Sequence, residues 1–205
     1  MENILFLILG WLLGLFGPWL TELIQKPYRR AQLKRSIFIE LEDLRRKIAA
    51  VSFIIASESG AVDRKLLEWI EPIMSSEDSP QARGVKAMLG RSDEELQALS
   101  QAWKTSGGGL NLKKYTLPFL TSQMTSLSLF TPEFQRLALD IYAQLSILNE
   151  EIDVARFNYE KTFDNSLSKN SYAAVRTNLE QTYQNIAGLC RRLSETIGLI
   201  LKKEK

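Results

Sequence analysis

Hydrophobic residues crowd the start of the chain and further on are spaced at helical intervals. Asn3 to Thr21 are nineteen positions without a charged side chain, and Leu, Ile, Phe, Trp and Gly dominate them. In a helix such a run rises about 1.5 Å per residue, so it comes close to crossing a hydrocarbon layer about 30 Å thick. The pattern predicts a membrane-spanning helix over about Ile4 to Ile24, within an anchor at 1–25.

Basic side chains follow this run with no acid among them, and only Glu2 is charged before it. The basic residues are Lys26, Arg29, Arg30, Lys34 and Arg35. A secretory signal has the reverse order and a small-residue cleavage site, so we expect an uncleaved anchor. The positive-inside rule then predicts a single-pass inner-membrane protein with its N-terminus outside and its C-terminal part in the cytoplasm. The alternative, a helix buried in a soluble core, seldom needs so long an uncharged run.

The net charge of +2 hides a local imbalance. The basic junction carries five positive charges, whereas from Ser36 onward 21 basic side chains are balanced by 22 acidic ones. We therefore expect the junction to bind anionic membrane lipids, and we expect no binding of DNA or RNA duplexes. On the last helix, Arg191 and Arg192 with Lys202 and Lys203 form a second basic group. It is either a solvated face or another contact with headgroups.

Small residues within the predicted span form a face suited to helix packing. Gly10 and Gly14 have the G-x-x-x-G spacing, and Gly17 extends it. Two interpretations stay open: self-association of the membrane helix into a homo-oligomer, and a chance spacing. Glu22 is expected at the membrane interface near Trp19, with a polar lumen of an oligomer as the alternative.

A heptad seam follows the junction, with apolar residues separated by alternating steps of four and three. Its members are Ile37, Leu41, Leu44, Ile48, Val51 and Ile55. This spacing predicts an amphipathic stalk helix, which starts near Tyr28 and ends before Gly60. Junction and stalk together cover 26–60. The seam is expected to pair either with copies of itself or with later helices of the same chain.

Short, interrupted elements are predicted for the insertion at 61–130. Ser92 and Glu95 form a capping box that opens one short helix. Residues 110–115 alternate weakly in polarity and are expected to be extended. The segment 116–129 is apolar and rich in Ser and Thr, and we expect it to form one more short helix.

Two long helices are predicted for 131–205. The tripeptide Thr-Pro-Glu at 131–133 is a strong helix start, since it places a capping hydroxyl, a proline and an acid in that order. Apolar residues then recur at steps of three and four to about Phe163, and again after a polar turn at 165–171. Matched lengths and a short connection predict an antiparallel hairpin packed on the stalk. The expected fold class is all-α: an N-terminal transmembrane helix followed by a cytosolic helical bundle with long heptad-patterned helices.

The composition excludes several chemistries. The chain has no histidine, so Ser-His-Asp triads, His-ligated metals and histidine pH switches are absent. Its single cysteine, Cys190, excludes an internal disulfide and lies on an apolar helix face, where we expect a buried, unreactive thiol. Nothing positions a carboxylate, lysine or tyrosine for catalysis. We expect no enzyme activity and no cofactor or metal.

One polar cluster has the residues of an anion site. Gly107, Gly108 and Gly109 are followed by Lys113 and Lys114, and consecutive glycine amides with two lysines can hold phosphate groups. The spacing of a P-loop is missing and no strand precedes the glycines. A surface loop is the alternative interpretation.

These features favour a non-enzymatic, membrane-anchored protein with a helical oligomerisation or interaction domain. The order of parts also resembles the small single-pass membrane effectors of bacterial cyclic-oligonucleotide antiviral signalling. The matching parts are the span Ile4 to Ile24, the basic junction Lys26 to Arg35 and the helical body. The resemblance implies the alternative function of a ligand-gated, membrane-disrupting or pore-forming effector that binds a nucleotide second messenger. The glycine cluster would be its sensor.

Overall fold

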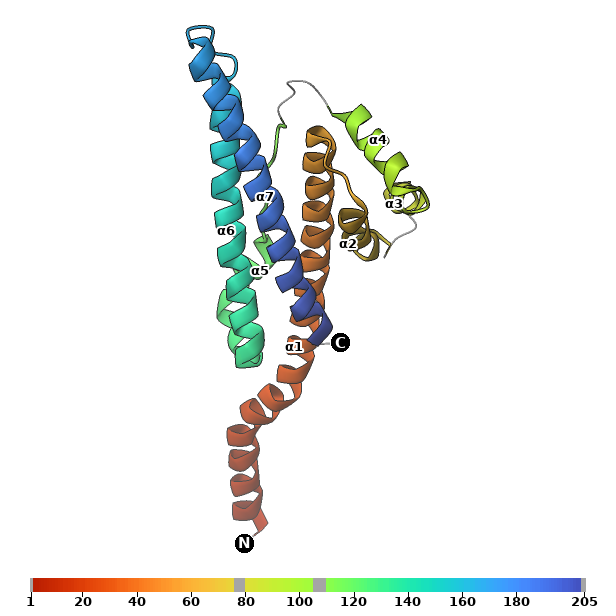
Figure 1. Ribbon diagram of the computed structural model, residues 1–205. Helices are drawn as coiled ribbons and strands as arrows, with labels where there is room; N and C mark the ends of the chain where they lie inside the picture. Colours follow the sequence, from red (N-terminus) through yellow and green to blue (C-terminus); the bar gives the residue numbers. More distant parts are fainter. Residues whose placement is uncertain (1, 76–79, 105–109, 204–205) are drawn as a thin grey trace.

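The computed structural model describes residues 2–75, 80–104 and 110–203 (Figure 1). Before Gln25 its description of side chains covers Trp11, Gly14 and Phe16. The described residues form seven α-helices and one 3-10 helix, and none of them lies in a β-strand. The all-α class is therefore confirmed.

The longest element is α1 (Glu2–Ser59), a single helix that includes both Pro18 and Pro27. The shorter helices α2 (Arg64–Met74), α3 (Pro80–Leu89) and α4 (Asp93–Trp103) follow. The chain then passes through α5 (Pro118–Ser122) and η1 (Met124–Leu129) to the long helices α6 (Pro132–Lys161) and α7 (Lys169–Lys203).

The heptad seam of α1 lies in the main core of the protein. All six of its residues are buried together with the apolar faces of α6 and α7. Of the two partners that the sequence left open for the seam, the structure shows the later helices of the same chain, α6 and α7. Gly60 ends α1 with a φ of +69°, a left-handed conformation that suits glycine, as expected for a helix C-cap.

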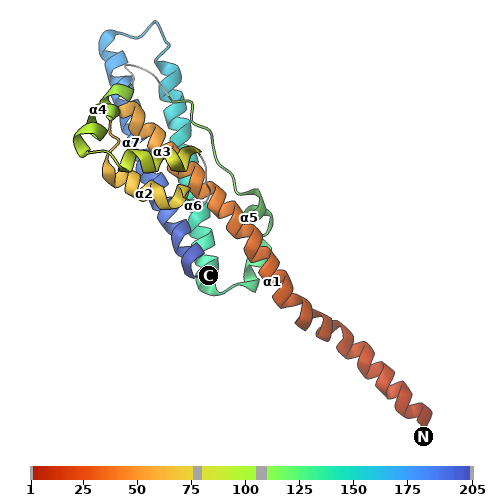
Figure 2. The same ribbon diagram turned by 90° about the vertical axis from the view of Figure 1, so that its right-hand side faces the viewer.

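Helices α6 and α7 form an antiparallel hairpin that packs on α1 through α7 (Figures 1 and 2). The Oγ1 atom of Thr131 accepts a hydrogen bond from the backbone N–H of Phe134 at 3.3 Å, which confirms the predicted helix start. The hairpin reaches beyond the end of α1 at the side of the body opposite the N-terminus (Figure 1).

The segment from Leu110 to Phe130 comes before α6 in the chain, and side chains of α1 and α6 hold it in place. The Glu40 carboxylate accepts hydrogen bonds from the backbone N–H groups of Phe119 and Leu120, both at 2.8 Å, and so caps α5. Asn149 of α6 bonds both the N–H and the C=O of Tyr115, at 2.9 and 2.8 Å. This segment therefore depends on polar groups that are far away in the sequence.

The prediction of a single helix over 116–129 is wrong, because the structure divides this segment into α5 and η1. The Glu40 cap fixes the start of α5 at Pro118, and the chain becomes extended again at Phe130. Ser and Thr have weak helix propensity, so tertiary contacts decide the local structure here. Residues 110–115 lie in neither a helix nor a strand.

We expect Glu40→Ala to lower the free energy of unfolding by about 2–3 kcal/mol, because two backbone donors lose a charged acceptor. Urea unfolding followed by circular dichroism measures the change. Asp43→Ala is the matched control: Asp43 pairs with Lys47 at 2.6 Å on the exposed side of the same helix, which contributes at most about 0.5 kcal/mol. Equal losses in the two variants would contradict the capping role.

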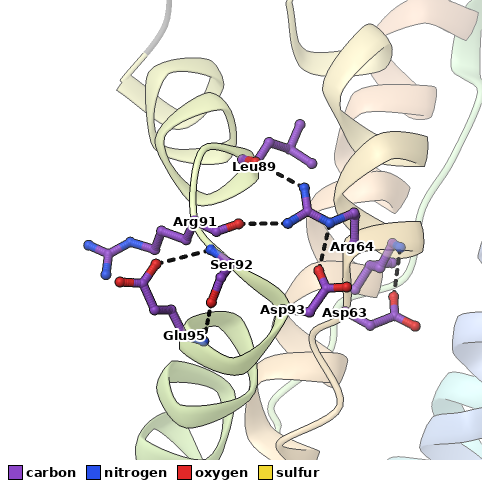
Figure 3. A network of polar contacts seen from close by, with 8 residues as sticks. Asp63, Arg64, Leu89, Arg91, Ser92, Asp93 and Glu95 are labelled. Atoms are coloured by element: carbon purple, nitrogen blue, oxygen red, sulfur yellow. Dashed lines mark hydrogen bonds and ion pairs between the residues drawn. The ribbon is translucent and has the colours of Figure 1, made fainter.

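Helices α2, α3 and α4 form a second, smaller core against another face of α1. This core contains Ala49, Val62, Leu67, Ile70, Ile73, Val85 and Leu96. Figure 3 shows Arg64 at the centre of the polar contacts that join these helices. Its Nε donates to Asp93 at 2.6 Å, and its two other nitrogens donate to the carbonyls of Leu89 and Arg91 at 3.0 and 2.6 Å. The capping box of Ser92 and Glu95 in the same turn is confirmed.

The N-terminal part of α1 projects from the body and changes direction below it (Figures 1 and 2). Within the part of the chain that the structure describes, no helix is long and apolar enough to cross a membrane. Most side chains of the predicted span, including the positions of Gly10 and Gly17, lie outside the described residues. At Gly14 a Cβ atom would have nothing within 4 Å.

Candidate functional site

The end of the body nearest the N-terminal part of α1 is here called the base. The start of α6 and the end of α7 both lie at this end, beside α1 (Figures 1 and 2). Thr131, Phe134, Ile200 and Lys203 line one small shared cleft, which places these two helix ends in contact. The body therefore presents two helix ends, the start of α6 and the end of α7, toward the projecting part of α1.

The basic junction lies along α1 where this helix enters the base. Lys26, Arg29 and Arg35 are exposed. Arg30 and Lys34 instead lie over aromatic rings: the Arg30 guanidinium is 5.8 Å from the centre of the Phe130 ring, and the Lys34 ammonium is 5.5 Å from that of Phe38. Cation–π contacts hold these two charges at the surface of the body.

Three phenylalanines form the apolar floor under these charges. The rings of Phe130 and Phe134 stack with centres 4.3 Å apart, and those of Phe38 and Phe134 lie 6.5 Å apart. Phe134 is only 1% exposed. The stack joins α1 to the start of α6. Arg30 and Lys34 of the basic junction therefore lie on a packed aromatic surface.

The second basic group of the sequence is divided between two places. Lys202 is exposed at the base, and Lys203 forms an ion pair with Glu133 of α6. Arg191 lies about 17 Å from Lys202, toward the start of α7. There its guanidinium is 5.9 Å from the Trp69 ring and 3.5 Å from Glu195. The structure does not bring Arg191 and Arg192 together with the two lysines.

The glycine cluster gains no support as an anion site. Gly107, Gly108 and Gly109 lie outside the described residues. Lys113 is exposed, but the Lys114 ammonium is 2.5 Å from a carboxylate oxygen of Asp153 on α6. That ion pair offsets the charge of one of the two lysines on which the hypothesis depends.

The single thiol belongs to the core. Cys190 is fully buried, and burial raises its pKa to about 12. The expected burial of this cysteine is confirmed, and its low reactivity stays a prediction. Among the described residues no group of three or more Cys, Asp and Glu could hold a metal ion.

We predict that thiol reagents at pH 8 leave Cys190 unmodified in the folded protein and modify it fully in denaturant. An exposed cysteine has a pKa near 8.5 and reacts readily at this pH. The release of thionitrobenzoate from Ellman's reagent measures the reaction. Fast modification without denaturant would contradict the burial of this side chain.

No family model, curated protein or solved structure matches this chain. The likeness to membrane effectors of antiviral signalling therefore stays a hypothesis about the order of parts.

Sequence reasoning missed two side chains that organise the body, Glu40 and Asn149. Both are polar residues beside an apolar seam, which is their one local signal.

Proposed function

We propose that this chain is a non-enzymatic membrane-anchored protein. In this proposal the first part of α1 lies in the bilayer, the base faces anionic headgroups on the cytoplasmic side, and the helical body interacts with other proteins or with copies of itself. The membrane lipids bound at the junction are the partners that the charge pattern specifies most directly.

The observation that carries the proposal is the projection of the apolar part of α1 beyond the body. Trp11 is 67% exposed and Phe16 54% exposed, although both are large apolar side chains. Large exposed apolar surfaces mark sites of interaction with a membrane or a partner. An uncharged run from Asn3 to Thr21 matches the length of a hydrocarbon core, which favours the membrane.

The charges at the base agree with this proposal. The junction follows the apolar run and lies where α1 enters the base. Basic residues near a bilayer surface contribute about 1 kcal/mol each when the lipid is anionic. The aromatic floor of Phe38, Phe130 and Phe134 lies under two of these charges, Arg30 and Lys34.

Self-association is proposed through the membrane helix. The heptad seam of α1 is occupied within the chain, so it is not free to pair with another copy. Gly10, Gly14 and Gly17 remain as the packing face, because small residues let two helix backbones approach closely.

Alkaline carbonate extraction of membranes from cells that express the full chain tests the anchor. We expect the protein to stay in the pellet and to float with lipid in a density gradient. Its release as intact soluble protein would overturn the proposal.

Native mass spectrometry in mild detergent tests self-association separately. Gly14→Leu is expected to reduce any oligomer, because the larger side chain blocks the close approach of two helices.

A further inference from the structure

A groove of about 750 Å³ lies between α1, α2 and α7. Arg45 lines it from α1, Pro72 and Ile73 line it from α2, and Leu199 and Lys202 line it from α7. Its volume is in the range of small-molecule sites, about 300–1,000 Å³. The lining therefore combines apolar side chains from α2 and α7 with positively charged ones from α1 and α7.

Arg45 is held in a defined position in this groove. Its Nε atom donates a hydrogen bond to the Oγ atom of Ser194 at 3.2 Å, and Ser194 is fully buried. Burial lowers the pKa of Arg45, while the charge of Glu42 acts in the opposite direction. Among the described residues Arg45 forms no ion pair with a carboxylate, so its two terminal nitrogens are available to an anion.

Gly198 gives the Arg45 guanidinium its place against α7. A Cβ atom added at Gly198 would lie 3.0 Å from one terminal nitrogen of Arg45 and 3.3 Å from its Cζ atom. The absence of a side chain at Gly198 thus lets the planar group lie close to the helix backbone. Lys202 is four residues later, on the same face of α7, so the two positive charges line the same groove.

The acidic residues of the groove offset only part of this charge. Glu195 lies 3.5 Å from Arg191, on its own helix. Glu42 is the other acid in the lining, and Arg45 and Lys202 are the two bases that face the proposed ligand. The site thus favours an anion, and its apolar wall favours a ligand that is more than an inorganic ion.

We propose that this groove binds a small phosphate ester, with its phosphate on Arg45 and Lys202 and its apolar part along Ile73 and Leu199. A guanidinium held by its Nε atom presents two terminal nitrogens that match two oxygens of one phosphate. Leu199 is 51% exposed, and covering it adds hydrophobic stabilisation. This inference concerns the body alone and goes beyond the proposed membrane role.

The position of the groove favours a soluble ester over a bilayer lipid. Arg45 follows Arg35, the last basic residue of the junction, by ten residues. This separation is about 15 Å along the helix. A lipid whose headgroup lies at the junction would have to leave the bilayer to reach Arg45.

Calorimetric titration of the full chain in phosphatidylcholine nanodiscs tests the proposal with two probes. They are 4-nitrophenyl phosphate, a soluble ester, and dihexanoyl phosphatidic acid, a short-chain lipid. We expect the soluble ester to bind and Arg45→Gln to weaken its binding at least about tenfold, because a charged hydrogen-bonding group is lost. Gly198→Ala is expected to weaken binding as well, by displacing the guanidinium.

Gly188→Ala is the matched control on the same helix, since a Cβ atom there has nothing within 4 Å, and it should bind like the wild type. Thermal melting of each variant checks that the body is folded. If phosphatidic acid binds with the same dependence on Arg45 and Gly198, the ester is a lipid phosphate and the site is still supported. Failure of both probes to bind, or equal binding by all variants, overturns the proposal.

Discussion

Trp11→Lys combined with Phe16→Lys is expected to move the protein from the membrane fraction to the soluble fraction. A lysine near the centre of a membrane-spanning helix costs about 2.5–3.5 kcal/mol, so two of them lower insertion by more than about a thousandfold. Both side chains are exposed and lie outside the two cores, so the body should keep its fold. Ultracentrifugation and immunoblotting of cell fractions measure the change.

Ile39→Lys with Ile54→Lys is the matched control for this prediction. These residues are also large, apolar and exposed, and they lie on the same helix within the body. Here the same two charges are added outside the apolar run, so the protein should stay in the membrane fraction. If the two double variants distribute alike, the apolar run is not what holds the protein at the membrane.

Phe134→Ala is expected to lower the free energy of unfolding by about 3–5 kcal/mol, the largest effect of a single substitution that we predict. The side chain is 1% exposed and lies between Phe38 of α1 and Phe130. Its removal leaves a cavity at the base and breaks the ring stack that joins α1 to the start of α6. Chemical unfolding of the detergent-solubilised chain, followed by circular dichroism, gives the value.

Phe157→Ala on the same helix is the control for Phe134→Ala. Phe157 is 59% exposed, and its ring contacts Lys161 at 5.0 Å on the surface of α6. We expect a loss of at most about 0.5 kcal/mol for this change. A loss at Phe134 no greater than that at Phe157 would show that the ring stack does not stabilise the base.

The long helices of this fold could be predicted because their signals are local. The seam from Ile37 to Ile55, the Thr131 cap and the capping box of Ser92 and Glu95 all depend on residues within a few turns of one another. Such spacing determines which face of a helix is apolar, and that face is then buried wherever the partner lies.

The features that the sequence did not yield depend on distant partners. Glu40 binds backbone groups 79 and 80 residues away, and Arg45 binds Ser194 over a separation of 149 residues. The residues next to Glu40 and Arg45 in the sequence do not indicate which distant groups these side chains bind. The capping of α5 and the groove at Arg45 were therefore not predicted. The same holds for the division of 116–129 into α5 and η1, since Glu40 fixes where α5 begins.

Labelling of single cysteines in spheroplasts is the most direct test of the central claim that α1 crosses the membrane and leaves the body in the cytoplasm. Glu2→Cys and Arg192→Cys are made separately in a Cys190→Ala background and treated with a membrane-impermeant maleimide. We predict modification at position 2 in intact spheroplasts, and at position 192 only after lysis. Modification of position 192 before lysis, or protection of position 2, would contradict the account.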